Sequence, residues 1–166
     1  LVLVICIVVF SLIGSVLSAN SKTRVIIEET NENYIMSLAE QGAQTISNIP
    51  SELASSREYA NVMQGIEMKG VDSAYAYLVD ADGTMLFHPA AEKIGQPVEN
   101  SVIKGVVAQI QSGTIPKNEV VEYDYKGAIK YAGYAITGGN MIVVVTADKG
   151  EIVAPIDDMM KTMGFV

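Results

Sequence analysis

The chain has 166 residues, which is room for one ordinary domain plus a membrane or targeting segment, and this excludes a second catalytic domain. Its 11 basic and 19 acidic residues give a formal charge of −8, which disfavours nucleic acid and anionic lipid headgroups as partners. The only cysteine, Cys6, lies in an apolar run, so no disulfide can form within the chain.

The N-terminal segment, LVLVICIVVFSLIGSVLSAN, contains no charged side chain. Twenty helical residues at about 1.5 Å each span the ~30 Å hydrocarbon core of a bilayer. We therefore expect a transmembrane helix over residues 1–20. A cleaved signal peptide is the alternative, because Ser18 and Ala19 suit a peptidase, although the apolar run exceeds the usual length of such a core.

The next segment, residues 21–68, is predicted to be helical. Ile35, Leu38, Gly42 and Ile46 recur at steps of three and four residues, which is typical of a helix that packs along a narrow stripe. The pattern favours one long helix continuous with the membrane segment. It is interrupted near Pro50, which lacks an amide hydrogen, and a shorter helix follows to about residue 68.

Strand patterns begin after residue 72. SAYAYLVD and TMLFHP predict two strands joined by DADG, where aspartate side chains bond local amides and Gly83 permits a positive φ. PVENSVIKGVVAQIQSG predicts an amphipathic helix that ends at Gly113. Residues 118–137 alternate as two strands that turn at Lys126 and Gly127, and MIVVVTAD, apolar on both faces, predicts a central strand.

The element order is a long helix, two strands, a helix and three strands. The last three strands follow one another through tight turns, so they must be antiparallel neighbours. We predict an α+β domain over residues 21–150, an antiparallel sheet with helices to one side. Residues 151–166 are predicted to form a helix that leads to a second, truncated membrane span.

The stretch YLVDADGTML resembles the first motif of haloacid-dehalogenase-type phosphatases. In that family Asp80 would be the nucleophile, Asp82 the general acid/base and Thr84 an assisting group. The family has a parallel α/β fold, whereas this stretch enters an antiparallel hairpin, so the structural context does not support the motif. A membrane-tethered phosphatase is therefore kept only as the alternative hypothesis. Calcium binding is disfavoured, because Met85 and Ala91 stand where an EF-hand loop needs glycine and glutamate.

The only histidine, His88, ends the second predicted strand. Without a second histidine or an available cysteine the chain cannot build an ordinary zinc site, and no serine or cysteine pattern supports a nucleophilic triad. His88 either bonds the backbone at the strand end or contributes a hydrogen bond to a ligand pocket. We expect no catalytic residue, no metal site and no cofactor, so the chain is not predicted to be an enzyme.

The whole pattern resembles the single-Cache extracytoplasmic sensor domains of bacterial methyl-accepting chemotaxis proteins. The resemblance rests on the anchor, the long helix, the turn at Asp80–Gly83, the pair His88–Pro89 and the following Ile94–Gly95. It implies a PAS-like antiparallel sheet with a long N-terminal helix continuous with a transmembrane helix. It also implies a small-molecule ligand, an amino acid or short carboxylate, bound outside the cytoplasm by a homodimer integral to the cell membrane.

The resemblance further implies that ligand binding displaces helices and so controls a cytoplasmic kinase complex, through a signalling region that this sequence does not include. A sensor kinase or a cyclase is an equally open output. A secreted structural or adhesive domain is a third alternative, and it predicts cleavage near Ala19.

Tyrosines dominate the predicted pocket, with eight in the chain and no tryptophan. A tyrosine joins an apolar ring to a polar tip, which suits a small polar ligand, but strand packing alone also explains each ring. Lys130 is the expected partner of a ligand carboxylate and Asp148 of an amino group, with Arg57 a further candidate cation. The predicted ligand-binding residues are Tyr75, Tyr77, His88, Tyr123, Tyr125, Lys130, Tyr131 and Asp148.

Overall fold

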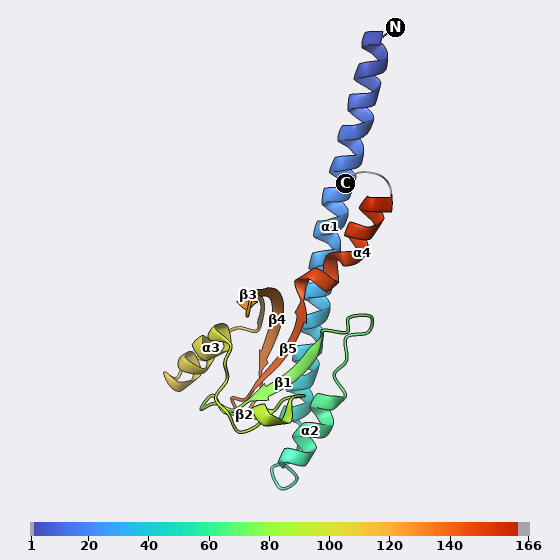
Figure 1. Cartoon of the computed structure of the whole chain (residues 1–166). Coiled ribbons are helices and arrows are strands. Elements are labelled where there is room, and N and C mark those ends of the chain that lie inside the picture. Colours follow the sequence, from blue (N-terminus) through green and yellow to red (C-terminus); the bar gives the residue numbers. More distant parts are fainter. Residues whose placement is uncertain (1, 163–166) are drawn as a thin grey trace.

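A five-stranded antiparallel sheet in the order β2-β1-β5-β4-β3 forms the centre of the computed structural model, which describes residues 2–162 (Figure 1). The strands are β1 (Tyr75–Val79), β2 (Met85–Phe87), β3 (Glu119–Tyr125), β4 (Ala128–Ile136) and β5 (Ile142–Asp148). The helices are α1 (Val2–Ser47), α2 (Ser56–Gln64), α3 (Ser101–Gln111) and α4 (Lys149–Thr162), with a 3-10 turn, η1, at Ala91–Lys93. The predicted order of elements and the antiparallel pairing of the last three strands are confirmed.

Strand β5 is the central strand, as its sequence predicts. Val143 and Val145 pack with α1 on one face, and Ile142 and Val144 pack with α3 on the other. The prediction that helices lie to one side of the sheet is therefore wrong. Helices α1, α2 and α4 cover one face and α3 covers the opposite face (Figure 1), because a strand that is apolar on both faces must be covered on both.

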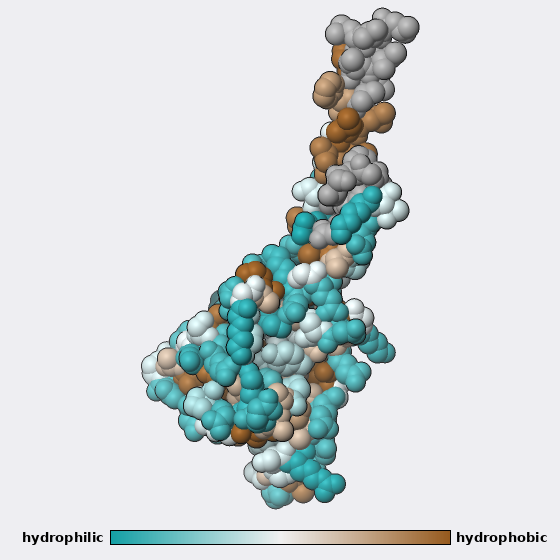
Figure 2. All heavy atoms as spheres, in the orientation of Figure 1, coloured by the Kyte–Doolittle hydropathy of each residue, from teal (hydrophilic) through white to brown (hydrophobic). Residues whose placement is uncertain are grey.

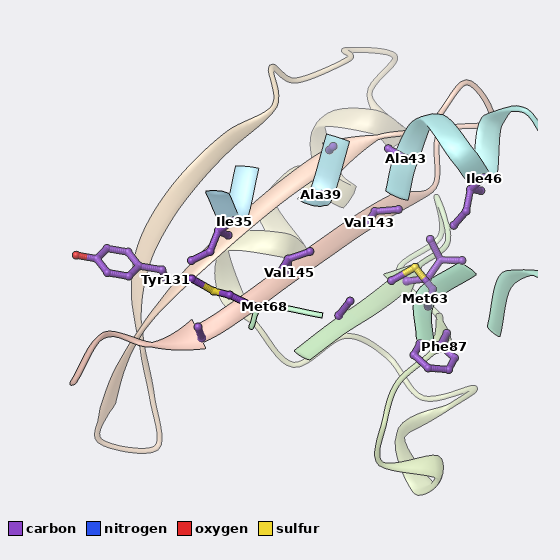
Figure 3. Packing of buried hydrophobic residues seen from close by; sticks show 14 of the residues in the cluster. Ile35, Ala39, Ala43, Ile46, Met63, Met68, Phe87, Tyr131, Val143 and Val145 are labelled. Carbon is purple, nitrogen blue, oxygen red and sulfur yellow. The ribbon is translucent and has the colours of Figure 1, made fainter. Parts of the chain in front are cut away.

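Of the predicted apolar stripe of α1, Ile35, Gly42 and Ile46 are buried and Leu38 is partly buried. Ile35, Ala39, Ala43 and Ile46 are buried against β4, β5 and α2 (Figure 3). Small residues at two of these positions bring the helix close to the strands, and burial of the larger chains removes apolar surface from water at about 25 cal/mol per Å². The helix is thereby fixed to β4 and β5, the two strands that lie between β1 and β3 in the sheet.

The interruption near Pro50 is confirmed, since α1 ends at Ser47 and α2 begins at Ser56. The Ser55 side chain caps α2 by accepting a hydrogen bond from the Glu58 amide. This second helix ends at residue 64, earlier than predicted, because Gly65 follows it and has the low helix propensity of glycine.

The N-terminal part of α1 extends away from the sheet, and α4 runs beside α1 (Figure 1). Large apolar side chains of this part are exposed (Figure 2), and they are Ile7, Phe10, Leu12, Ile13 and Leu17. Over residues 2–162, no helix has both the length and the apolar character that crossing a membrane requires. Residue 1 of the predicted anchor and residues 163–166 of the predicted C-terminal helix lie outside the described residues.

Candidate functional site

The turn between β1 and β2 is held by its own aspartates. Asp80 Oδ1 accepts a hydrogen bond from the Ala81 amide (2.7 Å), and Asp82 Oδ1 accepts one from the Thr84 amide (2.8 Å). The bonds from Thr84 hold the pKa of Asp82 below its ordinary value. Gly83 has a φ of 92°, as the turn requires. The predicted structural role of DADG is confirmed, and the antiparallel sheet gives the phosphatase alternative no support.

A small polar cavity lies on the α3 face of the sheet, and we call it the tyrosine pocket. Its volume is about 20 Å³, enough for one water molecule. Strands β1 and β3 and the loop from β2 to α3 supply its walls. The lining residues are Tyr75, Tyr77, Met85, His88, Lys93, Val98, Glu99, Asn100, Tyr123 and Tyr125.

His88 is 9% exposed, and its ring packs in tilted contact against two pocket tyrosines. Its ring centroid lies 5.3 Å from that of Tyr75 and 5.8 Å from that of Tyr77. Its Nδ1 accepts a hydrogen bond from the Ala90 amide (2.9 Å). Burial and the neighbouring Lys93 lower the pKa of His88, so the ring is neutral and its proton is on Nε2. The predicted backbone bond at the strand end is observed and the ring also lines the cavity. A hydrogen bond from His88 to a ligand stays a prediction.

The phenols of Tyr75, Tyr77 and Tyr123 are held in their neutral form. Burial, with a smaller contribution from Tyr123, raises the pKa of Tyr75 to about 12, and burial also raises the pKa values of Tyr77 and Tyr123. The Tyr123 hydroxyl lies 3.1 Å from Thr146 Oγ1, which itself donates to the Tyr131 carbonyl (2.7 Å). Because Thr146 has one hydroxyl hydrogen, Tyr123 is the donor in their contact.

Three side chains join at the exposed rim of the pocket, and we call them the rim triad. Lys93 Nζ donates to the Tyr125 hydroxyl (2.9 Å) and to Glu99 Oε2 (3.0 Å), and Tyr125 donates to the same carboxylate (2.8 Å). Tyr125 and then Glu99 raise the pKa of Lys93, and Tyr125 and then Lys93 lower the pKa of Glu99. The triad ties η1, the segment before α3, and β3 together across the pocket.

Asn100 is a pocket residue that sequence reasoning missed. It is the N-cap of α3, and its Oδ1 accepts hydrogen bonds from the amides of Val102 (2.8 Å) and Ile103 (3.4 Å). It is 7% exposed, and its buried Nδ2 has no hydrogen-bond partner among the described residues. An asparagine before an apolar helix is a capping signal, and its side-chain oxygen is the capping group. The sequence does not indicate what surrounds the NH2 group of the same side chain.

The remaining predicted residues lie outside the tyrosine pocket. Lys130 and Asp148 form an ion pair with each other, and Lys130 Nζ lies 5.6 Å from the centroid of the Tyr75 ring. Tyr131 is buried on the α1 face of the sheet, with Lys149 Nζ 5.3 Å from its ring centroid. The pocket therefore gathers five of the predicted residues, Lys130 and Asp148 lie next to it, and Tyr131 does not join it. The five are Tyr75, Tyr77, His88, Tyr123 and Tyr125.

A second, larger hollow of about 600 Å³ lies between α2, β1 and β2. It shares Tyr75 and His88 with the tyrosine pocket, and its other walls are mostly apolar, including Met63, Ile66 and Leu86. Within residues 2–162, no group of three or more histidine, cysteine, aspartate or glutamate side chains is placed to hold a metal ion.

Comparison with known proteins finds similar folds among solved structures. No protein-family model and no curated protein sequence matches it. The extracellular domain of mmHK1S-Z3, a proposed histidine kinase, is 20% identical with a TM-score of 0.50, over 64% of this chain and 40% of that one. The ligand-binding domain of Mlp24 with asparagine is 17% identical with a TM-score of 0.46, over 63% of this chain and 40% of that one.

A further similar structure is the ligand-binding domain of the Pseudomonas aeruginosa PAO1 chemoreceptor PctB with L-Arg, at 17% identity, a TM-score of 0.42, and coverage of 66% and 41%. The chain thus spans about two fifths of the length of these structures. The likeness to mmHK1S-Z3 concerns the fold alone: this chain shares the fold of that extracellular domain over 64% of its length.

Proposed function

We propose that this chain is the extracytoplasmic sensor domain of a membrane chemoreceptor, that it binds a small molecule in the tyrosine pocket, and that it signals through α4. The observation that carries the proposal is the pocket itself, in which neutral phenols, a neutral imidazole and a buried amide converge beside a lysine. A few convergent polar groups in an otherwise packed wall are typical of a small-molecule site. The fold it shares with an extracellular domain supports the same assignment.

The ligand that fits this proposal is an amino acid or a short carboxylate, and no reaction takes place in the domain. Asp80 and Asp82 each give one carboxylate oxygen to a hydrogen bond within their own turn, which supports a structural role for both.

A short route connects the pocket to α4. The ring of Tyr75 lines the pocket and lies under Lys130, which pairs with Asp148, and α4 begins at the next residue, Lys149. A second connection runs through the segment that precedes Tyr75 in the chain. The carboxylate of Glu151 in α4 accepts hydrogen bonds from the amides of residues 72 (2.6 Å) and 73 (2.8 Å). Movement of Tyr75 on ligand binding would therefore reach the first turn of α4 from two directions.

The membrane anchor at residues 1–20, the homodimer and the helix displacement are parts of the proposal. Exposed apolar side chains on α1, such as Phe10 at 75% and Leu12 at 61%, are suited to a lipid or helix partner. A ligand with unequal affinity for two helix arrangements would shift their populations, and a cytoplasmic kinase complex would read the shift through a signalling region beyond this sequence.

Ligand screening by thermal unfolding tests the binding function. The purified chain would be unfolded with each of a panel of amino acids, short carboxylates, neutral amides and amines. A ligand at 100 times its dissociation constant adds about 2.7 kcal/mol of stability, which raises the melting temperature by several degrees. A panel in which no compound raises the melting temperature would contradict the proposal.

The signalling part is tested by distance measurement. Spin labels at Lys22 on α1 and Lys161 on α4, with Cys6 replaced by serine, would report a change in interhelical distance when a compound from the screen binds. Lys130→Met should leave binding within about threefold and reduce that distance change, because it cuts the link from Tyr75 to Asp148. A distance that ligand leaves unchanged in the unsubstituted protein would refute signalling through α4.

A further inference from the structure

We propose that Asn100 selects the ligand: its Nδ2 donates a hydrogen bond to a carboxylate oxygen of the bound molecule while its Oδ1 continues to cap α3. This inference rests on the proposed function, namely that the tyrosine pocket is the binding site. It assigns the recognition of the carboxylate to Asn100 and not to Lys130, whose charge is already paired with Asp148.

The orientation of the Asn100 amide is fixed by the helix. The amides of Val102 and Ile103 need an acceptor, and of the two ends of the asparagine side chain only the oxygen can accept. The NH2 group is therefore held on the other side, beside the phenols of Tyr77 and Tyr123. Asn100 is one of the residues that line the tyrosine pocket. The NH2 group is buried and has no hydrogen-bond partner among the described residues, which makes it a donor that a ligand acceptor would satisfy.

The acceptors nearest to the Asn100 amide are the phenol oxygens of Tyr77 and Tyr123. The amide is near enough to offset part of the rise that burial causes in the pKa values of these phenols, but it is not in the geometry of a hydrogen bond. His88 presents a protonated Nε2, and the carboxylate of Glu99 is engaged by Lys93 and Tyr125.

A phenol both donates and accepts, so the preference of the pocket is set by the groups that only donate, which are Asn100 Nδ2, His88 Nε2 and Lys93 Nζ. Such groups favour a ligand that only accepts. A carboxylate has two oxygens with about four acceptor sites and no donor, whereas the corresponding amide replaces one of those oxygens with an NH2 group. Lys93 Nζ at the rim adds a positive charge, which strengthens hydrogen bonds to an anion. The volume of about 20 Å³ holds one such oxygen, so the rim triad must part to admit the rest of the molecule.

The test compares the affinities of carboxylates with those of their amides, and then the affinities of variants that keep an N-cap residue at position 100. Isothermal titration would measure acetate, propionate and L-alanine against acetamide, propionamide and L-alaninamide, with the whole chain as receptor. At least one carboxylate should bind at least tenfold more tightly than its amide. Asn100→Asp retains a good N-cap but replaces the donor with a second acceptor, so it should fold normally and lose at least tenfold in affinity for that carboxylate. Asn100→Ser, a neutral cap without the amide, should show a loss in the same direction.

Ser55→Asp is the control, because it makes an equivalent cap substitution in α2, away from the pocket, and should leave affinity unchanged. In the unsubstituted protein, the side-chain NH2 resonances of Asn100 should shift when the bound carboxylate is added. Unchanged affinity in Asn100→Asp, or equal affinity for acid and amide, would overturn the inference. Binding of amines alone in the wider screen would overturn it while the sensor function stands. Binding of nothing at all would remove both.

Discussion

Gly133 in β4 lies directly beneath Ile35 of α1, at the point where the long helix crosses the sheet. A Cβ atom placed on Gly133 would be 2.7 Å from Ile35 Cγ2 and 3.2 Å from both the carbonyl carbon and the carbonyl oxygen of Ile35. Ile35 is fully buried, so neither its side chain nor its backbone has space to move aside. The close approach of α1 to β4 therefore depends on the absence of a side chain at position 133.

Gly133→Ala is expected to lower the free energy of unfolding by about 1–3 kcal/mol, the usual cost of overpacking a core. Chemical denaturation of both proteins would measure the difference. Gly105→Ala is the matched control, because position 105 is exposed in α3 and a Cβ there meets nothing within 4 Å. That substitution should raise stability by up to about 1 kcal/mol through helix propensity. Equal stability of Gly133→Ala and the parent would disprove the tight contact.

The elements of this fold could be predicted because local patterns specify them. The alternation of Val121, Tyr123 and Tyr125 and the turn at Gly127 determine β3, the hairpin and the start of β4 without reference to the rest of the chain. The sequence did not predict that helices cover both faces of the sheet. This placement depends on which face of the sheet α3 reaches after the loop from β2, and no local pattern specifies that path.

The candidate site was predictable to the same extent. Tyr75, Tyr77 and Tyr123 share a face because strand side chains alternate, so their meeting follows from the period of two. Lys93 and Asn100 reach the pocket from irregular segments, whose course follows from tertiary packing. Tyr131 was misplaced relative to the pocket by one position, since its neighbour Lys130 points to the opposite face of β4.

Tyr125→Phe is expected to weaken the rim triad without changing the sheet. The hydroxyl of Tyr125 is the largest contributor to the low pKa of Glu99, so its removal should move that pKa toward the ordinary value of 4.5. Titration of the Glu99 side-chain carboxyl carbon by NMR would measure the change. Backbone amides of residues 93–100 should also exchange faster with deuterium, because the segment loses both of its hydrogen bonds to Tyr125 in β3.

Tyr34→Phe serves as the control for this substitution, since Tyr34 is 40% exposed on α1. It should leave both the Glu99 titration and the exchange rates as they are. If Glu99 titrates identically in Tyr125→Phe and in the parent, the hydrogen bond between Tyr125 and Glu99 is absent in solution.

His88 offers a direct pH measurement, because it is the only histidine in the chain. Burial and Lys93 lower its pKa, so its ring C–H resonances should titrate with a midpoint below 6.5. Nitrogen shifts at neutral pH should identify the tautomer protonated at Nε2, as the acceptor role of Nδ1 requires. Lys93→Met should raise the midpoint, and a midpoint at or above 6.5 in the parent would contradict the buried, neutral ring.

Glu151 predicts how the stability of the link between α4 and β1 depends on pH. Hydrogen bonds from Ser73 and Asp72 hold its pKa below the ordinary 4.5, so the folded state binds this proton less readily than the unfolded state does. The stabilisation is complete above pH 4.5 and is lost as the pH falls through the lower, folded-state value, because the unfolded chain is protonated first.

Glu151→Gln should therefore cost more stability at pH 7 than at pH 3, where the native carboxyl is also approaching neutrality. Urea denaturation of the variant and the parent at both pH values would measure this difference. Asp158→Asn is the matched control, since Asp158 is exposed further along α4 and pairs there with Lys161 at 3.5 Å. A loss of stability in Glu151→Gln that is the same at pH 7 and pH 3 would mean that the charge of Glu151 is not what holds α4 to the segment before β1.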